Sequence, residues 1–182
     1  VNMEMGYSTV GTLHERRGEN RILDLENMSD DKGQIWTRIY GSGLNENGTD
    51  RFQYEGNLYG VQIGHDFKIN KDKNGNDHLL GGYISYNRAS TDFFDEYRAE
   101  NGKISDSKYT GKGKSESISL GITKTKYTPK GSYYDLVGQV SYLQNKYNSR
   151  DDYSAKQNGF GLLLSGEAGK SFSISKNGNW SV

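Results

Sequence analysis

Apolar and polar side chains alternate with a period of two residues along most of the chain. In the segment NLYGVQIGHDF, residues 57–67, one parity is bulky and apolar, whereas the other holds glycines, an amide and a carboxylate. Strict alternation of this kind predicts a β-strand with two unlike faces. The pattern recurs in residues 33–43, 78–90, 115–127, 132–145 and 159–172, and a seventh segment begins at residues 179–182. The sequence therefore predicts an all-β protein.

One segment near the N-terminus, residues 8–28, predicts a helix instead. Val10 and Leu13 lie on one face of it, and Ser8 or Thr9 stands where an N-terminal cap is expected. The pattern alone favours a short surface helix.

The connectors between the strands differ in length. Compact turn signals alternate with long polar links at residues 88–115 and 145–158; the turn signals are Asn74-Gly75, Pro129 with Gly131, and Asn177-Gly178. The two ends of the sheet are therefore expected to be unlike. A membrane barrel accounts for this, because its short turns face the periplasm and its longer loops face the outside.

The character of the polar parity favours the same class. A soluble sheet usually exposes lysine, glutamate and threonine, whereas this parity is rich in glycine with single hydrogen-bonding groups, which suits a hydrated lumen. The expected lumenal residues are Arg38, Gln62, Asp66, Asp135, Gln139 and Glu167. Aromatic residues near the strand ends are expected at the membrane interfaces: Trp36, Tyr40, Phe67, Tyr86, Tyr127, Tyr133, Phe172 and Trp180.

Composition and charge exclude several classes of protein. Lysine plus arginine and aspartate plus glutamate number 23 each, so no net charge points to a nucleic-acid partner. The chain has no cysteine, and no apolar run is long enough for a transmembrane helix. Its first residues lack a signal-peptide pattern, so we expect either a cytoplasmic protein or an interior segment of a longer secreted precursor.

No motif predicts catalysis. The histidines at positions 14, 65 and 78 lie in different segments, without the spacing of metal ligands. The sequence GEAGKS, residues 166–171, lacks the glycine that a phosphate-binding loop requires at position 164. The sequence DKNGND, residues 72–77, has Tyr83 where a calcium loop has its glutamate. We therefore expect no enzymatic activity, no metal and no cofactor.

The succession of six motifs resembles the C-terminal translocator of autotransporters, the type V secretion proteins of Gram-negative bacteria. These motifs are TLHERRGE, WTRIYGSG, NLYGVQIGHD, GGYISY, YYDLVGQVSY and GLLLSGEAGKSF, followed by NW. The resemblance implies an up-and-down outer-membrane β-barrel of twelve strands with a helix threaded through its pore. Residues 1–30 would be a linker containing the pore helix (residues 8–20), and residues 31–182 would be the first six to seven strands of a truncated barrel.

The resemblance also implies a function and partners. The domain would carry its own N-terminal passenger to the cell surface and anchor it. Its partners would be outer-membrane lipids, the passenger, the barrel-assembly machinery and periplasmic chaperones, with no nucleic acid. Some family members cut their own linker between two asparagines, but Gly11-Thr12 stands at that position here. That form of self-cleavage is therefore not expected.

A lumen with carboxylates would hold the basic linker in place. We expect Arg16 and Arg17 to pair with lumenal carboxylates, with Asp66 and Glu167 as the first candidates. The alternative is that both arginines are solvated. Two other functions also remain open from the residues alone: a small-solute outer-membrane porin, and a soluble all-β binding domain.

Overall fold

A computed structural model describes residues 2–17, 33–47, 51–69 and 71–170. Two helices come first, α1 (Asn2–Val10) and α2 (Leu13–Arg17). Six long strands follow: β1 (Gln34–Asn47), β2 (Phe52–Ile69), β3 (Asp77–Asp95), β6 (Tyr109–Tyr127), β7 (Ser132–Ser149) and β8 (Ser154–Lys170). A small hairpin, β4 (Ala99–Glu100) with β5 (Lys103–Ile104), lies between β3 and β6. The prediction of an all-β fold is confirmed, whereas the expected strand at 179–182 lies outside the described residues.

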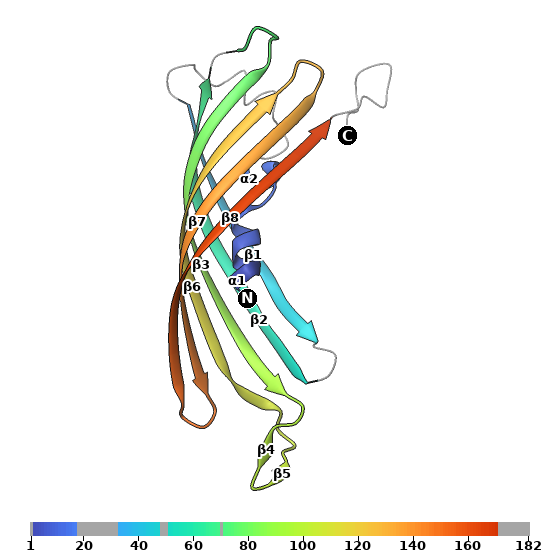
Figure 1. The fold of residues 1–182 in the computed structure, drawn as a ribbon, viewed down its shortest axis with the longest axis vertical. Coiled ribbons are helices and arrows are strands. Elements are labelled where there is room, and N and C mark those ends of the chain that lie inside the picture. Colours follow the sequence, from blue (N-terminus) through green and yellow to red (C-terminus); the bar gives the residue numbers. More distant parts are fainter. Residues whose placement is uncertain (1, 18–32, 48–50, 70, 171–182) are drawn as a thin grey trace.

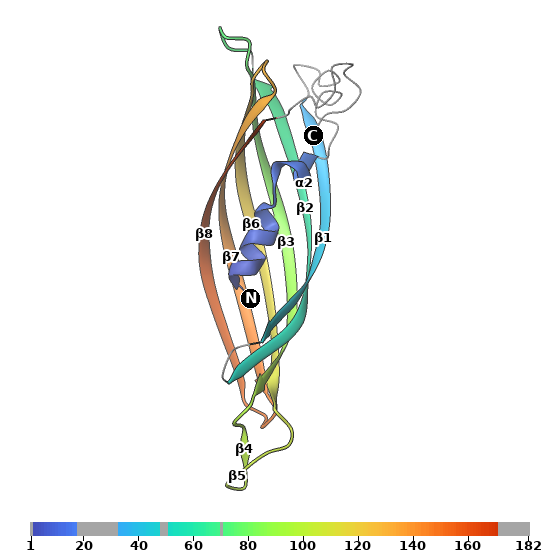
Figure 2. The ribbon, with the colours of Figure 1, turned by 90° about the vertical axis from the view of Figure 1, so that its right-hand side faces the viewer.

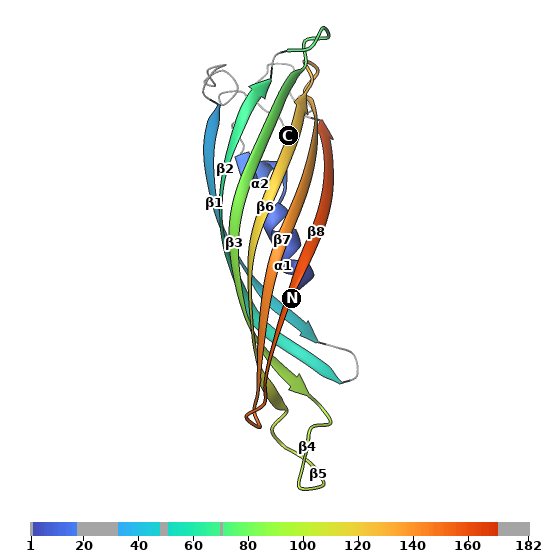
Figure 3. The same cartoon turned by 60° about the vertical axis from the view of Figure 1, so that its left-hand side comes forward.

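The six long strands form one antiparallel sheet in the order β1-β2-β3-β6-β7-β8. Each strand therefore pairs with the next long strand along the chain, which is the up-and-down arrangement. The sheet curves strongly, and both helices lie against its concave face (Figures 1 and 2). Viewed from the other side, the six strands run side by side with the helices behind them (Figure 3).

The connectors depart from the expected alternation of lengths. Residues 96–108 form a long link that carries the β4–β5 hairpin, but the link at 150–153 is as short as the turn at 128–131. Polar residues extend the pairing of β7 and β8, where Asn145 lies opposite Gln157. The expected long link at 145–158 is therefore wrong, because backbone pairing in a sheet does not require apolar side chains.

The two faces of the sheet differ as the alternation predicts. On the convex face bulky apolar side chains are exposed, with Ile39 at 82% and Phe160 at 89% of full exposure. The same face carries Ile35, Tyr59, Val61, Ile63, Phe67, Leu80, Ile84, Tyr86, Ile118, Leu120, Ile122, Tyr134, Leu136, Val140, Leu162 and Leu164. A contiguous apolar surface of this extent is unstable in water and suits contact with acyl chains.

Aromatic rings lie across glycines on the concave face. Trp36 is directly opposite Gly64 on the neighbouring strand, and Tyr133 is directly opposite Gly169. A Cβ atom on either glycine would collide with the ring that covers it. The glycine-rich parity therefore has a packing role, since each glycine leaves room for the ring of its cross-strand neighbour.

These rings correct part of the interfacial assignment. Trp36, Tyr40 and Tyr133 lie on the concave face, where the hydroxyl groups of the two tyrosines make hydrogen bonds. Tyr127 packs its ring against Tyr133 on the same face. The alternation along β1 already predicts this face, because Trp36 and Tyr40 share the parity of Arg38. Phe67 and Tyr86 lie on the exposed convex face, and Phe172 and Trp180 lie outside the described residues.

The turn between β2 and β3 is fixed by its own side chains. The carboxylate of Asp72 accepts hydrogen bonds from the Asn76 side chain at 2.7 Å and from the backbone N–H groups of Asn74 and Asn76. These hydrogen bonds, that of the Asn76 side chain foremost, hold the pKa of Asp72 well below its usual range. This acidic turn therefore satisfies its carboxylate internally, as an Asx-type turn does.

Candidate functional site: a helix clamp on the concave wall

Helix α1 is buried by apolar contacts with the concave wall. Met5 of α1 packs in a cluster with Leu44, Leu58 and Ala89, from β1, β2 and β3. Val10 packs with residues of β3 and β7 in a second cluster. The first helix thus contacts strands β2, β3, β7 and β8.

The helical conformation is interrupted at Gly11, which lies between the two helices and adopts a φ of +55°. Its N–H donates to the Tyr7 carbonyl at 3.1 Å and so ends α1, as a left-handed glycine often does. Thr12 and Glu15 then form a reciprocal capping box, in which each backbone N–H donates to the side chain of the other residue. The expected single helix starting at Ser8 or Thr9 is therefore wrong, because both residues belong to the last turn of α1.

Replacing Gly11 with alanine is expected to destabilise the docked helices by about 1–2 kcal/mol, the cost of a left-handed conformation for a residue with a Cβ. The new Cβ would also lie 2.5 Å from atoms of Arg38 and Glu15. The measurement is the urea dependence of protease cleavage in the helical segment of the full-length protein. Gly43→Ala is the matched control, since a Cβ there meets no atom within 4 Å. Equal behaviour of the two variants would contradict the role of Gly11.

Arg38 of β1 joins the two helices. Its Nη1 donates to the carbonyls of Ser8 at 3.0 Å and Thr9 at 3.2 Å, at the C-terminal end of α1. Its Nη2 donates to Oε2 of Glu15, the capping residue of α2, at 2.9 Å. A guanidinium is well suited to this position, because it presents several donors in a fixed fork to carbonyl and carboxylate oxygens.

Thr9 is the residue on which most of the polar contacts converge, and it is fully buried. Its carbonyl accepts a second hydrogen bond from Gln62 Nε2 at 3.0 Å. Its hydroxyl donates to the Met5 carbonyl at 2.6 Å and accepts from Asn87 Nδ2 at 2.8 Å and Tyr40 at 3.3 Å. Strands β1, β2 and β3 thus each supply a polar group to the break between the helices.

A buried ion pair holds the second helix. The Arg16 guanidinium donates to the Asp135 carboxylate and to the Val10 carbonyl, the latter at 3.1 Å. The other oxygen of Asp135, which is 2% exposed, accepts from the Thr125 hydroxyl at 2.7 Å. Partners on both sides compensate for removing this carboxylate from water.

The remaining expected lumenal residues also lie on the concave face. Glu167 accepts from the Leu13 backbone N–H at 2.8 Å and from the Tyr133 hydroxyl. Gln139 accepts from the Tyr83 hydroxyl at 2.8 Å. Asp66 is buried and accepts a hydrogen bond from the Thr123 hydroxyl at 3.5 Å.

Sequence reasoning did not anticipate several features of this site. It placed Asp66 and Glu167 ahead of Asp135 as partners of Arg16, whereas the structure pairs Arg16 with Asp135. The side chain of Arg17 lies outside the described part. Thr9 was expected only as a helix cap, and Asn87 was not singled out, although the parity of Asn87 on its strand agrees with a concave position.

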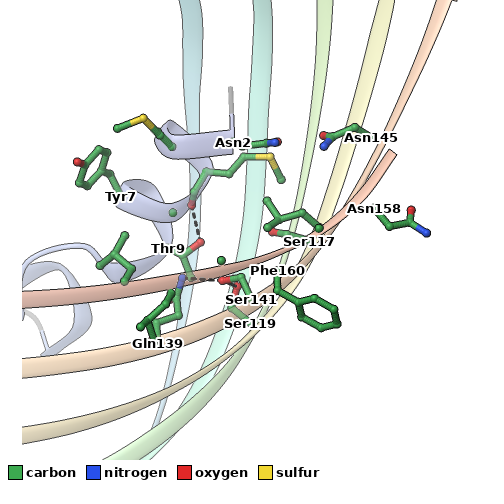
Figure 4. Close-up of a pocket in the computed structure, with 18 of the residues that line it drawn as sticks. Asn2, Tyr7, Thr9, Ser117, Ser119, Gln139, Ser141, Asn145, Asn158 and Phe160 are labelled. Atoms are coloured by element: carbon green, nitrogen blue, oxygen red, sulfur yellow. Dashed lines mark hydrogen bonds between the residues drawn. The ribbon is translucent and has the colours of Figure 1, made fainter. Parts of the chain in front are cut away.

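A cavity of about 520 Å³ lies beside α1, between that helix and strands β6 to β8 (Figure 4). On the sheet side its lining combines the polar residues Ser117, Ser119, Gln139 and Ser141 with the apolar residues Leu143 and Leu163, and Thr9 contributes from α1. Among the residues that the structure describes, no cluster of histidine, aspartate or glutamate could hold a metal ion.

Together, the apolar convex face, the up-and-down pairing and the polar concave face define the wall of a transmembrane β-barrel with a helix against its inside. The chain belongs to the autotransporter family, since the family model described as the autotransporter beta-domain matches residues 35–182. It is also similar to the serine protease EatA of Escherichia coli O78:H11 (strain H10407 / ETEC), with 30% identity over 152 residues. That match covers 80% of this chain and 9% of EatA, so the chain spans a small part of its relative.

Family membership confirms several of the expectations from sequence. The chain is a translocator domain of a type V secretion protein, in the outer membrane of a Gram-negative bacterium, and such a domain is not itself catalytic. It also implies a passenger domain elsewhere in the protein. The two other classes, a small-solute porin and a soluble binding domain, are set aside. None of the helices in the described ranges is long and apolar enough to cross a bilayer.

Proposed function

We propose that this domain carries its own N-terminal passenger to the cell surface and then anchors it in the outer membrane. The observation that carries the proposal is the pair of helices buried against the concave wall. The start of α1 is directed toward the β4–β5 end of the sheet, whereas α2 lies nearer the opposite end (Figure 2). A passenger joined before Asn2 would then leave the barrel at the β4–β5 end, which would face outward.

In this proposal residues 1–30 are the linker with its pore helix, and residues 31–182 are the N-terminal part of the barrel. The contacts of Arg38, Gln62, Asp135 and Glu167 with the helical segment would retain the linker after the passenger has crossed. Arg17, Asp66 and Gln139 would complete this lumenal set. Anchoring would then depend on many charge-assisted hydrogen bonds, which are stronger than neutral ones.

Folding of the passenger outside the cell would supply the driving force, and the domain would perform no chemical reaction. Before insertion the convex face would expose its apolar side chains to water, which promotes aggregation. Periplasmic chaperones and the barrel-assembly machinery are therefore the expected partners, together with outer-membrane lipids.

Surface exposure of an epitope inserted immediately before Asn2 of the full-length protein tests the proposal. We expect a protease added to intact cells to remove this epitope. An epitope placed in the turn at residues 71–76 is the matched control, and we expect it to be cleaved only after permeabilisation, because that turn lies at the opposite end of the sheet. Protection of the first epitope in intact cells would contradict the proposal.

A further inference from the structure

The apolar band on the convex face ends at a defined row of residues. On strands β6, β7 and β8, Ile118 lies directly opposite Tyr142, and Tyr142 lies opposite Phe160. The rings of Tyr142 and Phe160 are in contact, with centroids 5.3 Å apart. This row forms the edge of the apolar band nearest the β4–β5 end, and aromatic rings are typical of such an edge.

Three lysines form a row beyond that edge. Lys114 lies directly opposite Lys146, and Lys146 lies directly opposite Lys156, so one lysine comes from each of three adjacent strands. All three have the outward parity and are exposed. They lie four residues beyond Ile118, Tyr142 and Phe160, or about 13 Å along the strands at about 3.3 Å per residue. This separation, reduced by strand tilt, places their amines at the level of the lipid head groups.

The row lacks counter-ions within the described part of the chain. Nearby lysines have partners: Lys112 lies 3.9 Å from Asp92, and Lys108 lies 3.6 Å from Glu96. Among the described residues, no carboxylate forms an ion pair with any of the three lysines in the row, although like charges directly opposite each other destabilise a sheet. An anion from outside the chain would remove this repulsion.

We propose that Lys114, Lys146 and Lys156 bind the phosphate groups of an anionic lipid in the leaflet at the β4–β5 end. Lysine is a strong phosphate ligand as a point charge, and three in register match a head group that carries several phosphate oxygens. The row continues the lipid-facing surface, which makes a lipid the occupant that fits its position. Given the orientation under "Proposed function", on which this step rests, the lipid is a phosphorylated glycolipid of the outer leaflet.

The test is the binding of lipopolysaccharide to the purified full-length protein that carries Lys114→Gln, Lys146→Gln and Lys156→Gln. We expect affinity to fall about a hundredfold, since each lysine near a charged membrane surface contributes about fivefold. The matched control is Lys103→Gln, Lys124→Gln and Lys130→Gln, which removes the same charge from other exposed positions. An unchanged affinity, or an equal loss in both triple variants, would overturn the proposal.

Two further measurements show whether the phosphate bound by the lysine row belongs to a lipid or is free in solution. Lipopolysaccharide stripped of its phosphates is expected to bind the wild-type protein as weakly as the intact lipid binds the variant. Inorganic phosphate in the millimolar range is expected not to displace the lipid, and complete displacement would overturn binding of a lipid. Heat-modifiable migration checks folding, and the single variant Lys146→Gln, with an expected fivefold loss, serves if the triple variant does not fold.

The epitope before Asn2 separates this proposal from the proposed function. The triple variant is expected to display that epitope as the wild type does, because its lysines have the outward parity, whereas the helices lie against the concave face. Loss of lipid binding with display retained supports the lysine row. If the triple variant binds the lipid as the wild type does and still displays the epitope, the lipid site is overturned and the proposed function stands.

Discussion

The variant Val140→Lys is expected to lower the free energy of unfolding of the vesicle-inserted full-length protein by about 2 kcal/mol, because a lysine on the lipid face of a barrel costs about 2–4 kcal/mol at the bilayer midplane and less toward the interfaces. Val140 is exposed on the convex face, between Leu120 of β6 and Leu162 of β8 in the same row. A charged amine there would have to leave the acyl chains or draw water into them. The difference in the free energy of unfolding between variant and wild type is measured by denaturant titration, with tryptophan fluorescence as the signal.

The neighbouring variant Ser141→Lys is the matched control. Ser141 has the opposite parity and lines the cavity of about 520 Å³ beside α1, so a lysine there has room and a polar surround. It loses the hydrogen bond of 2.7 Å to Ser119, for an expected cost of about 1 kcal/mol. If Ser141→Lys cost as much as Val140→Lys, the assignment of the two faces would be wrong.

Asp135→Ala is expected to have the second large effect, because it leaves the Arg16 guanidinium buried without its carboxylate. Removing one partner of a buried ion pair costs about 3–5 kcal/mol. The helical segment should respond by leaving the wall, since side-chain contacts hold it there, whereas β7 is hydrogen-bonded to a strand on each side. We therefore expect faster protease cleavage within residues 2–17 and a higher ion conductance of the full-length protein in planar bilayers.

Two further variants separate loss of the pair from loss of a charge. Arg16→Met combined with Asp135→Leu replaces the pair with apolar side chains and should restore most of the protection of the helices. Glu116→Ala removes a carboxylate that contacts Arg88 and Tyr86 on the outward parity, and should leave conductance unchanged. Unchanged conductance in Asp135→Ala would show that the ion pair does not hold the helix.

The sidedness of the strands could be predicted because the pleat fixes a period of two. That rule placed Val61 and Ile63 outward and Gln62 inward, as in the structure. The assignment failed where a preference for aromatics at membrane interfaces was set above the alternation itself. Trp36, for example, has the parity of Arg38, and its ring lies over a glycine of the next strand.

The contacts that hold α1 and α2 against the concave wall could be predicted only in part. The segment Asn2–Val10 carries a weak helical pattern, and burial of Met5 and Val10 against the wall stabilises it more than propensity does. The role of Thr9 depends on three strands that converge on one hydroxyl and one carbonyl. Such convergence follows from register and curvature, and the alternation along each strand does not show which positions of different strands will meet.

The most direct test of sidedness uses the absence of cysteine from this chain, which allows single cysteines to be introduced one at a time along β8. Spin labels at positions 160 to 165 of the full-length protein in vesicles would report contact with oxygen, which enters lipid, and with a water-soluble nickel chelate. We predict high oxygen access at Phe160, Leu162 and Leu164, and low oxygen access at the three positions between them. Uniform access along the strand, or the reverse alternation, would contradict a lipid-facing convex surface.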